Sequence, residues 1–249
     1  MGETADILVI DGESGGSTPW EFDSITEDGS CVFQQSSGAA IHGSGGYEAV
    51  PTNNNTDNDM YGTKSFSSQS DMYLRYYFKV SSDWVCSDDE GFYVRPLYEN
   101  IYYTILLLFK YDLANTAFGV NVYFRDTSGA VLLTERLEEN VIYRGTSYCF
   151  EFRYVSHAST GGASFWLDQV LQDSDYTKDT STFTPNILTP GIQGFYGSPT
   201  ITAGKLYFDD IVLSTTGPIG AYSGPTGGGG SIIQNTRRTM HARARGRHK

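Results

Sequence analysis

The stretch SYCFEFRYVS, residues 147–156, decides the fold class of this chain. Every second position carries an aromatic ring, at Tyr148, Phe150, Phe152 and Tyr154. Because successive side chains of a β-strand point to opposite faces of a sheet, these rings share one face. We therefore predict a strand whose aromatic face lines a core and whose other face, carrying Glu151 and Arg153, meets solvent.

The same alternation recurs along the chain between turn-forming residues. Further strands are predicted at 6–11, 20–25, two short stretches within 38–50, 71–80, 91–98, 102–110, 118–126, 130–137, 162–171, 191–197 and 204–214. Residues 51–64, rich in Asn and Asp, are predicted to form an exposed loop. Roughly twelve to fourteen strands without a helix predict one all-β domain, built as a two-sheet antiparallel sandwich.

Charge divides the chain into two parts of opposite sign. The chain has 249 residues and a formal net charge of −12, yet all 29 Asp and Glu residues lie before residue 231. Six of the 17 Lys and Arg residues lie near the C-terminus, at Arg237, Arg238, Arg243, Arg245, Arg247 and Lys249. The rest of the chain, with 11 Lys and Arg against 29 Asp and Glu, carries −18. This part disfavours nucleic acid and anionic membranes as partners, whereas the basic segment favours an acidic one.

Gly, Pro and Ser dominate residues 216–231, where we predict a flexible linker. It separates a β-sandwich domain, residues 1–215, from a basic C-terminal arm, residues 232–249. The arm could bind nucleic acid, a membrane surface or an acidic protein surface, or be a solvated tail without function. The negative domain and the low apolar content of the arm favour an acidic protein surface, with the six terminal cations as the contact residues.

The chain shows no sequence feature of export or membrane insertion. No basic region followed by an apolar core opens the chain, so we expect no signal peptide and synthesis in the cytoplasm. The longest apolar stretch, YYTILLLF at 102–109, is too short to span a bilayer and suits a buried strand. The scattered Cys31, Cys86 and Cys149 predict buried reduced thiols rather than a disulfide framework or a zinc site.

Several of these stretches resemble one known superfamily. GKLYFDDIVLS at 204–214, together with GASFWLDQVLQ at 162–172 and the earlier WEFDS and GAAIHGSGGYEAV, resembles the concanavalin A-like lectin/glucanase superfamily, particularly its laminin-G-like jelly rolls. The resemblance covers residues 5 to 215 in strand order. It implies a jelly-roll sandwich in which early strands lie beside the final strand.

The catalytic residue sets of this superfamily are incomplete in the chain. Retaining glycosidases use an E-x-D-x-E pattern, but EFD at 21–23 is followed by Ile25 where the acid should stand. Lyases of this fold use Q-[IV]-H and Y-F-K-x-G-x-Y elements; residues 77–79 match only the start of the second, and His42 has no Gln two positions before it. No nucleophile elbow, HExxH, P-loop or Rossmann motif occurs. We therefore expect no enzyme activity and assign no catalytic residue.

Related folds also bind calcium and glycans, which suggests two further sites. Residues 56–62, 87–91 and 173–179 hold enough oxygen ligands for a structural calcium ion. None is an EF-hand loop, and Asp and Asn are common in turns for backbone reasons, so no metal ligand is assigned and no cofactor is expected. For a glycan, Trp84 in SSDWVCSDD is the best-placed loop aromatic. The alternative is that Trp84 packs into the domain as an anchor.

A laminin-G-like jelly roll without a signal peptide or a catalytic set also resembles structural proteins of tailed bacteriophages. This resemblance implies a non-enzymatic virion structural protein, and among these we favour a head decoration or cement component. Its partners would be other virion proteins, in an oligomeric particle assembled in the host cytoplasm. The alternative prediction is a carbohydrate-binding module of lectin type.

Overall fold

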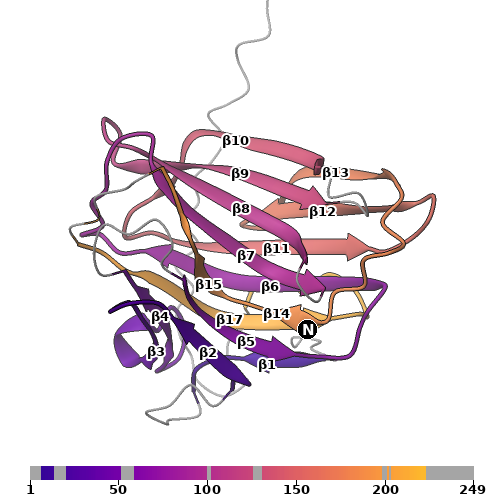
Figure 1. Ribbon diagram of the computed structural model, residues 1–249, viewed down its shortest axis with the longest axis horizontal. Coiled ribbons are helices and arrows are strands. Elements are labelled where there is room, and N and C mark those ends of the chain that lie inside the picture. The colour runs from indigo at the N-terminus through magenta and orange to yellow at the C-terminus, as the bar shows by residue number, and fades with distance from the viewer. Residues whose placement is uncertain are drawn as a thin grey trace, which may run out of the picture.

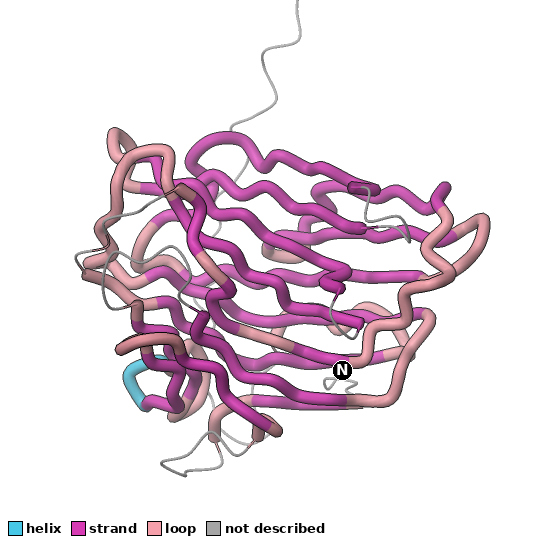
Figure 2. The backbone as a smooth tube through the Cα atoms, in the orientation of Figure 1, coloured by secondary structure: helices cyan, strands magenta, loops and turns pink. Residues whose placement is uncertain are grey.

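Two antiparallel β-sheets pack face to face and form the whole of the layered structure (Figure 1). The computed structural model describes residues 7–13, 21–51, 59–99, 102–125, 131–197, 201 and 203–222. Within these residues the helical structure consists of one 3-10 turn, η1 (Ser37–Ala39) (Figure 2). The predicted all-β, two-sheet antiparallel sandwich is therefore confirmed.

The stretch that decides the fold class forms β11 (Ser147–Val155), near the middle of an eight-stranded sheet. The strands of this sheet run in the order β13 (Val170–Lys178), β12 (Gly161–Leu167), β11, β6 (Asp71–Val80), β17 (Leu206–Ser214), β4 (Gly46–Val50) and β3 (Val32–Ser36), and β1 (Leu8–Ile10) also pairs with β17. The early strands β1 and β4 thus lie beside the final strand, as the jelly-roll resemblance implies.

The second sheet has nine strands and faces the viewer in Figure 1. Its order is β10 (Val131–Tyr143), β9 (Ala117–Arg125), β8 (Tyr102–Asp112), β7 (Gly91–Glu99), β14 (Ile187–Leu188), β5 (Asp59–Ser65) and β15 (Gly191–Gln193), while β16 (Phe195–Tyr196) pairs with β7 and β2 (Ser24–Glu27) pairs with β5. The long strands β7 to β10 come from one continuous part of the chain. The short strands β14, β15 and β16 come from a much later part and fill the space between β7 and β5.

Aromatic rings from both sheets fill the space between the layers. Phe78 of β6 stacks on Phe109 of β8 with ring centroids 4.9 Å apart, and Phe109 lies 6.2 Å from Phe150 of β11. Phe150, Phe152 and Tyr154 are fully buried, so the aromatic face predicted for β11 is its core face. Such ring pairs add to the stability that burial of apolar surface already gives.

Two predictions about buried groups are confirmed. The apolar stretch at 102–109 lies in β8, and Phe109 at its end is fully buried. Cys31, Cys86 and Cys149 are free and buried, as expected for structural thiols. No helix in the described part of the chain has the length and apolarity needed to cross a membrane.

The exposed loop predicted for 51–64 is wrong from Asp59 onward, because this part of the chain is β5. Met60 of β5 is fully buried between the sheets. The acidic stretch at 173–179 likewise lies mostly in a strand, β13, at the edge of the eight-stranded sheet. An edge strand such as β13 pairs with a neighbour on one side only and needs few apolar residues, so its sequence resembles that of a loop.

The chain after β17 continues along the outer face of the eight-stranded sheet, and we call residues 215–222 the C-terminal strap. Glu151 accepts hydrogen bonds from the backbone N–H groups of Ile219, at 2.8 Å, and Gly220, at 3.2 Å. Arg75 donates to the Gly220 carbonyl at 3.0 Å, and Tyr222 N–H donates to the Tyr77 hydroxyl at 2.8 Å. The start of the predicted linker, through Tyr222, is therefore fixed to the domain.

The strap explains an error in the predicted solvent face. Glu151 was expected to meet solvent, yet it is only 5% exposed, and its cross-strand partner Arg75 is fully buried. Both charged groups bond to the strap backbone, which gives them polar partners away from water. Ile219 adds an apolar contact, because it is buried against Tyr73 and Val212.

Candidate functional site

Aromatic and basic side chains gather on the outer face of the nine-stranded sheet. On β7, Phe92 and Val94 belong to the core, so the alternate residues Tyr93 and Arg95 point outward. The same alternation turns other side chains of β5, β8, β9 and β16 to this face. We call it the tyrosine face and define it by Tyr61, Tyr93, Arg95, Tyr98, Lys110, Tyr123 and Tyr196.

Four of these side chains form one continuous row. The Nζ of Lys110 lies 4.9 Å from the ring centroid of Tyr196. The Tyr196 ring meets the Tyr93 ring edge-on, with centroids 6.3 Å apart and an interplanar angle of 82°. The Arg95 guanidinium carbon lies 5.3 Å from the Tyr93 ring centroid. Cation–π contacts of this kind hold a cation beside a ring and leave its N–H groups able to bind an anion.

Two glycines make room for Lys110 in the row. Lys110 pairs with Gly91 of β7 on one side and with Gly119 of β9 on the other, and Gly91 also pairs with Tyr196. A Cβ atom added at Gly91 would lie 1.6 Å from the carbonyl oxygen of Phe109, so no other residue fits there without a shift of the strands. Lys110 is 29% exposed and forms an ion pair with Asp89 at 2.5 Å.

Arg95 is the group on this face best suited to bind a carboxylate. Arg95 also forms a hydrogen bond with the Tyr98 side chain. Burial raises the pKa of the Tyr98 phenol above its ordinary value, although the charge and hydrogen bond of Arg95 lower that pKa. Tyr98 is therefore a neutral phenol at neutral pH. A guanidinium presents parallel N–H donors that match the two oxygens of a carboxylate. Two buried leucines, Leu106 and Leu108, alternate with the core residues of β8 and give this face an apolar floor.

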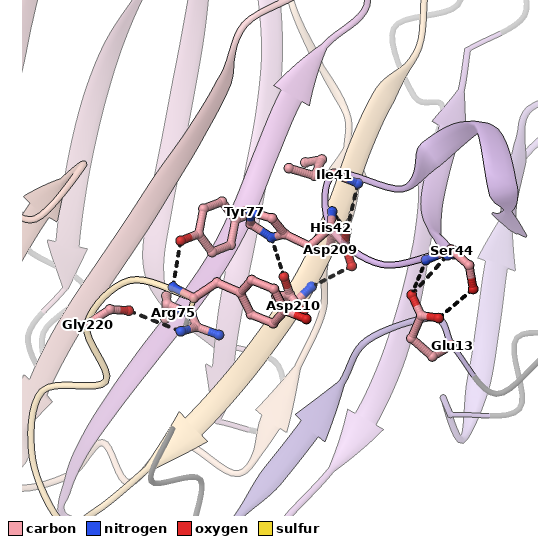
Figure 3. A network of polar contacts seen from close by, with 11 residues as sticks. Glu13, Ile41, His42, Ser44, Arg75, Tyr77, Asp209, Asp210 and Gly220 are labelled. Atoms are coloured by element: carbon pink, nitrogen blue, oxygen red, sulfur yellow. Dashed lines mark hydrogen bonds and ion pairs between the residues drawn. The ribbon is translucent and has the colours of Figure 1, made fainter. Parts of the chain in front are cut away.

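A second polar cluster lies on the outer face of the opposite sheet, beside the strap (Figure 3). Asp209 accepts backbone hydrogen bonds from Ile41 and His42, both at 2.7 Å, and from Asp210 at 2.8 Å. His42 is hydrogen-bonded through Nδ1 to the Asp210 carboxylate and stacks on Tyr222 of the strap, with ring centroids 4.3 Å apart. Burial raises the pKa of Asp209 to about 7, against the effect of the N–H donors from His42 and Ile41.

The residues of this cluster are also the candidate metal ligands in the described part of the chain. One ligand atom from each of His42, Asp209 and Asp210 lies within 4.8 Å of the others. The three backbone N–H donors already engage both carboxylate oxygens of Asp209, and His42 is already paired. The cluster therefore anchors the loop before β4 to the bulge in β17, and its residues need no ion to satisfy them.

Within the described residues, the stretches considered for calcium do not gather three such ligands. In the stretch 87–91, Asp88 accepts a hydrogen bond from the backbone of Leu113, and Asp89 pairs with Lys110. In the stretch 173–179, Asp175 binds Thr177 and Lys178. These carboxylates serve turns and ion pairs.

Trp84 does not lie where a sugar could stack on it. Its side chain is fully buried, with ring centroids 5.2 Å from Phe92 and 6.2 Å from Phe118. The structure therefore does not support Trp84 as a glycan contact. Its position agrees with the alternative prediction, in which Trp84 packs into the domain as an anchor. The six predicted contact residues of the arm lie outside the described residues: Arg237, Arg238, Arg243, Arg245, Arg247 and Lys249.

The residues that partly match the lyase sequence elements lie in the eight-stranded sheet and not on the tyrosine face. Tyr77 and Lys79 belong to β6, and His42 precedes β4, in the eight-stranded sheet. The row from Arg95 to Lys110 was missed because its members come from β7, β8 and β16, which only the sheet register brings together. The usable sequence feature was the alternation of polar with core residues in GFYVR, LLFKYD and GFYG.

Known proteins share this fold, although their sequences differ widely. No family profile and no curated protein sequence matches the chain. The endo-β-1,4-glucuronan lyase of the fungus Trichoderma reesei aligns with a TM-score of 0.57 at 12% identity, over 86% of this chain and 96% of the lyase. The cellulose induced protein Cip1 aligns with a TM-score of 0.56 at 16% identity, over 84% of this chain and 97% of Cip1.

A third structure carries a bound oligosaccharide. It is a double mutant of alginate lyase Aly36B, with a Lys and a Tyr replaced by Ala, in complex with alginate tetrasaccharide. It aligns with a TM-score of 0.57 at 14% identity, over 85% of this chain and 97% of the lyase. At such identities the likeness establishes a common fold alone, a two-sheet jelly-roll sandwich.

These comparisons correct two predictions. The prediction of a bacteriophage virion structural protein is wrong, because the similar structures are polysaccharide lyases and a cellulose induced protein, and they show no phage resemblance. The expectation of no enzyme activity is contradicted by the same finding, since lyases match the chain over most of its length. The alternative prediction, a carbohydrate-binding module of lectin type, agrees better with these comparisons, because the similar structures are carbohydrate-related proteins.

Proposed function

We propose that this protein binds and cleaves an acidic polysaccharide built from uronic acids, by β-elimination. The observation that carries the proposal is the row of Arg95, Tyr93, Tyr196 and Lys110 on one face of the sandwich. The fold shared with a glucuronan lyase and an alginate lyase supports it. Both of those proteins are named for polymers of uronic acids, whose carboxylate is a group that Arg95 suits.

The chemistry requires three things of the protein. A group must neutralise the carboxylate of the uronate, because this makes the proton on the adjacent carbon, C5, more acidic. A base then removes that proton, the bond from C4 to the bridging oxygen breaks, and a double bond forms between C4 and C5. An acid protonates the departing oxygen. Charge is conserved, and no oxidant or added water is needed.

The row supplies a residue for each requirement. Arg95 binds the carboxylate through its guanidinium and stabilises the charge that develops there. Tyr196, as the phenolate, can accept the C5 proton and then return it to the departing oxygen, and the Lys110 ammonium lies 4.9 Å from its ring centroid. Tyr93 lies between Arg95 and Tyr196 and offers a ring against which a sugar can pack.

The activity can be tested on the full chain with defined polymers. Polymannuronate, polyguluronate and glucuronan are offered as substrates, and cellulose serves as the uncharged control. Cleavage is followed by the ultraviolet absorbance of the new double bond. We expect product from at least one polyuronate and none from cellulose, and a rate about 10² to 10⁴ lower for Tyr196→Phe or Lys110→Met.

The opposite sheet offers matched control variants. Lys79 lies 5.6 Å from the ring centroid of Tyr207, so it forms a similar cation–π pair on the outer face of the eight-stranded sheet. Lys79→Met and Tyr207→Phe should leave the rate unchanged. Saturable polyuronate binding without product would reject cleavage and retain a carbohydrate-binding module. Absence of both binding and product would reject the proposed function.

A further inference from the structure

We propose that Gln193 and Thr189 are positioning residues that fix Arg95 for recognition of the substrate carboxylate. Neither side chain belongs to the tyrosine face, since Gln193 is 2% exposed and Thr189 is 4% exposed. The inference rests on the proposed function, because that function supplies the substrate carboxylate that Arg95 would bind. It goes further by assigning to two buried polar residues the orientation of the carboxylate-binding group.

A detour of the chain interrupts the regular strand pairing of β7 beside Arg95. β14 pairs with β7 at Leu97, and β16 pairs with β7 at Phe92. Between these two short strands the chain runs as β15, which pairs with β5, and there Gln193 pairs with Asp59. The backbone of Arg95 therefore faces a gap in the ladder of hydrogen bonds on this side.

Two side chains bridge the gap. The N–H of Arg95 donates to the side-chain oxygen of Gln193 at 2.6 Å, and the hydroxyl of Thr189 donates to the carbonyl oxygen of Arg95 at 2.6 Å. The side-chain N–H of Gln193 donates to the carbonyl oxygen of Thr189, also at 2.6 Å. The three bonds close a ring, so each of the two side chains fixes the other.

The other side of Arg95 is also irregular. The pairing of β7 with β8 shifts register between Val94 and Leu97, so Arg95 lies in the irregular part of this pairing. Pro96, which follows, has no N–H to contribute to a ladder. The side chains of Gln193 and Thr189 thus hold the backbone of Arg95 at a point where the strand pairing of β7 is irregular.

Local conformation shows how the detour is built. Gly191 has φ +133° and Gly194 has φ +94°, values that side-chain-bearing residues rarely adopt. The carbonyl of Gly194 accepts the N–H of Tyr93 at 3.0 Å, and the N–H of Thr189 donates to the Pro96 carbonyl at 3.0 Å. The same segment thus holds Tyr93 and Arg95, the two members of the row that β7 supplies.

A double-mutant cycle separates a positioning role from a merely structural one. The isosteric variants Gln193→Met and Thr189→Val are made in the unaltered chain and in Arg95→Met. Binding of a tetrasaccharide of the polyuronate that the protein binds is measured by calorimetry. We expect each variant to weaken binding roughly tenfold in the unaltered chain, the size of coupling that contacting residues show, and to have little effect in Arg95→Met.

A substrate-free measurement keeps the inference testable in every case. The Nε–H group of Arg95 gives an NMR signal whose relaxation reports the order of the guanidinium. We expect an ordered signal in the unaltered chain and a more mobile one in Gln193→Met and Thr189→Val. The Arg153 signal is the internal control, because its guanidinium is held by Asp71 at 2.7 and 3.0 Å on the other sheet.

The outcomes distinguish this inference from the proposed function. If Arg95→Met leaves polyuronate binding unchanged, the carboxylate-binding role of Arg95 fails while polyuronate binding itself stands, and the NMR comparison still decides whether Gln193 and Thr189 order Arg95. If Arg95→Met abolishes binding but Gln193→Met and Thr189→Val do not weaken it, only the inference fails. Equal losses in the presence and absence of Arg95, or an Arg95 signal of unchanged order, would also overturn it.

Discussion

The ammonium of Lys110 in β8 lies 4.9 Å from the ring centroid of Tyr196 in β16, and Gly91 of β7 lies between them in the sheet. The contact depends on the absence of a side chain at Gly91. The tyrosine face is thus a product of sheet register as well as of residue type.

Gly91→Ala should destabilise the protein and weaken the Lys110–Tyr196 contact. The added methyl group would lie 1.6 Å from the Phe109 carbonyl, so β7 and β8 must move apart. We expect the free energy of unfolding to fall by about 1–3 kcal/mol, as overpacking typically costs, in urea titrations. Gly38→Ala is the control, because its nearest atom would be the Ser36 hydroxyl at 3.4 Å. Equal stability of the two variants would contradict the crowding seen at Gly91.

Trp84→Ala should reduce stability and leave sugar binding unchanged. The indole is fully buried against Phe92 and Phe118, so its removal leaves a large cavity. We expect a loss of roughly 3–5 kcal/mol in the free energy of unfolding. Val85→Ala, at a neighbour that is 41% exposed, should change little. A folded Trp84→Ala protein with lower polyuronate affinity and unchanged stability would return Trp84 to the list of sugar contacts.

Cys86 and Cys149 should be unreactive in the folded protein at pH 8. Burial raises the pKa of the Cys149 thiol to about 12 and that of the Cys86 thiol to about 11. A raised thiol pKa means that the nucleophilic thiolate is scarce until the pH approaches these values. Mass spectrometry after iodoacetamide treatment should show full labelling of Cys86 and Cys149 in denaturant and little without it. Rapid native labelling at pH 8 would show that these sites open.

Glu151→Ala should release the C-terminal strap. Ile219 and Gly220 would lose the acceptor of their backbone N–H groups, and the buried Arg75 would lose a neighbouring negative charge. We expect a stability loss of at least about 1–3 kcal/mol, since buried donors would be left unsatisfied. Hydrogen exchange should accelerate at Ile219 and Gly220. Removal of the exposed carboxylate in Asp83→Ala should leave both amides protected.

The long central strands could be predicted from the sequence because their alternation is strict. β6 has the predicted bounds, and β11 differs by one residue. β5 and β13 were missed because a few apolar residues among Asp, Asn and Ser are enough for a strand that finds its partners elsewhere. Propensity describes a segment, whereas these strands are stabilised by pairing across the sheet.

The candidate site could be predicted less well than the fold. Individual features such as an outward Arg95 and an outward Lys110 follow from period-two alternation in their strands. Their proximity to Tyr196 depends on the path of residues 189–194, and no local sequence pattern predicts that path. Trp84 was considered as an exposed glycan contact because it stands in a polar stretch of sequence, but its side chain is buried in the core.

The position of the C-terminal strap determines how the protein can be immobilised on a surface. Tyr222 is held on the outer face of the eight-stranded sheet, whereas the tyrosine face belongs to the nine-stranded sheet. Whatever is joined after Tyr222 therefore starts from the side turned away from the tyrosine face. Coupling to a bead or a sensor chip through this end should leave that surface open to a long polymer.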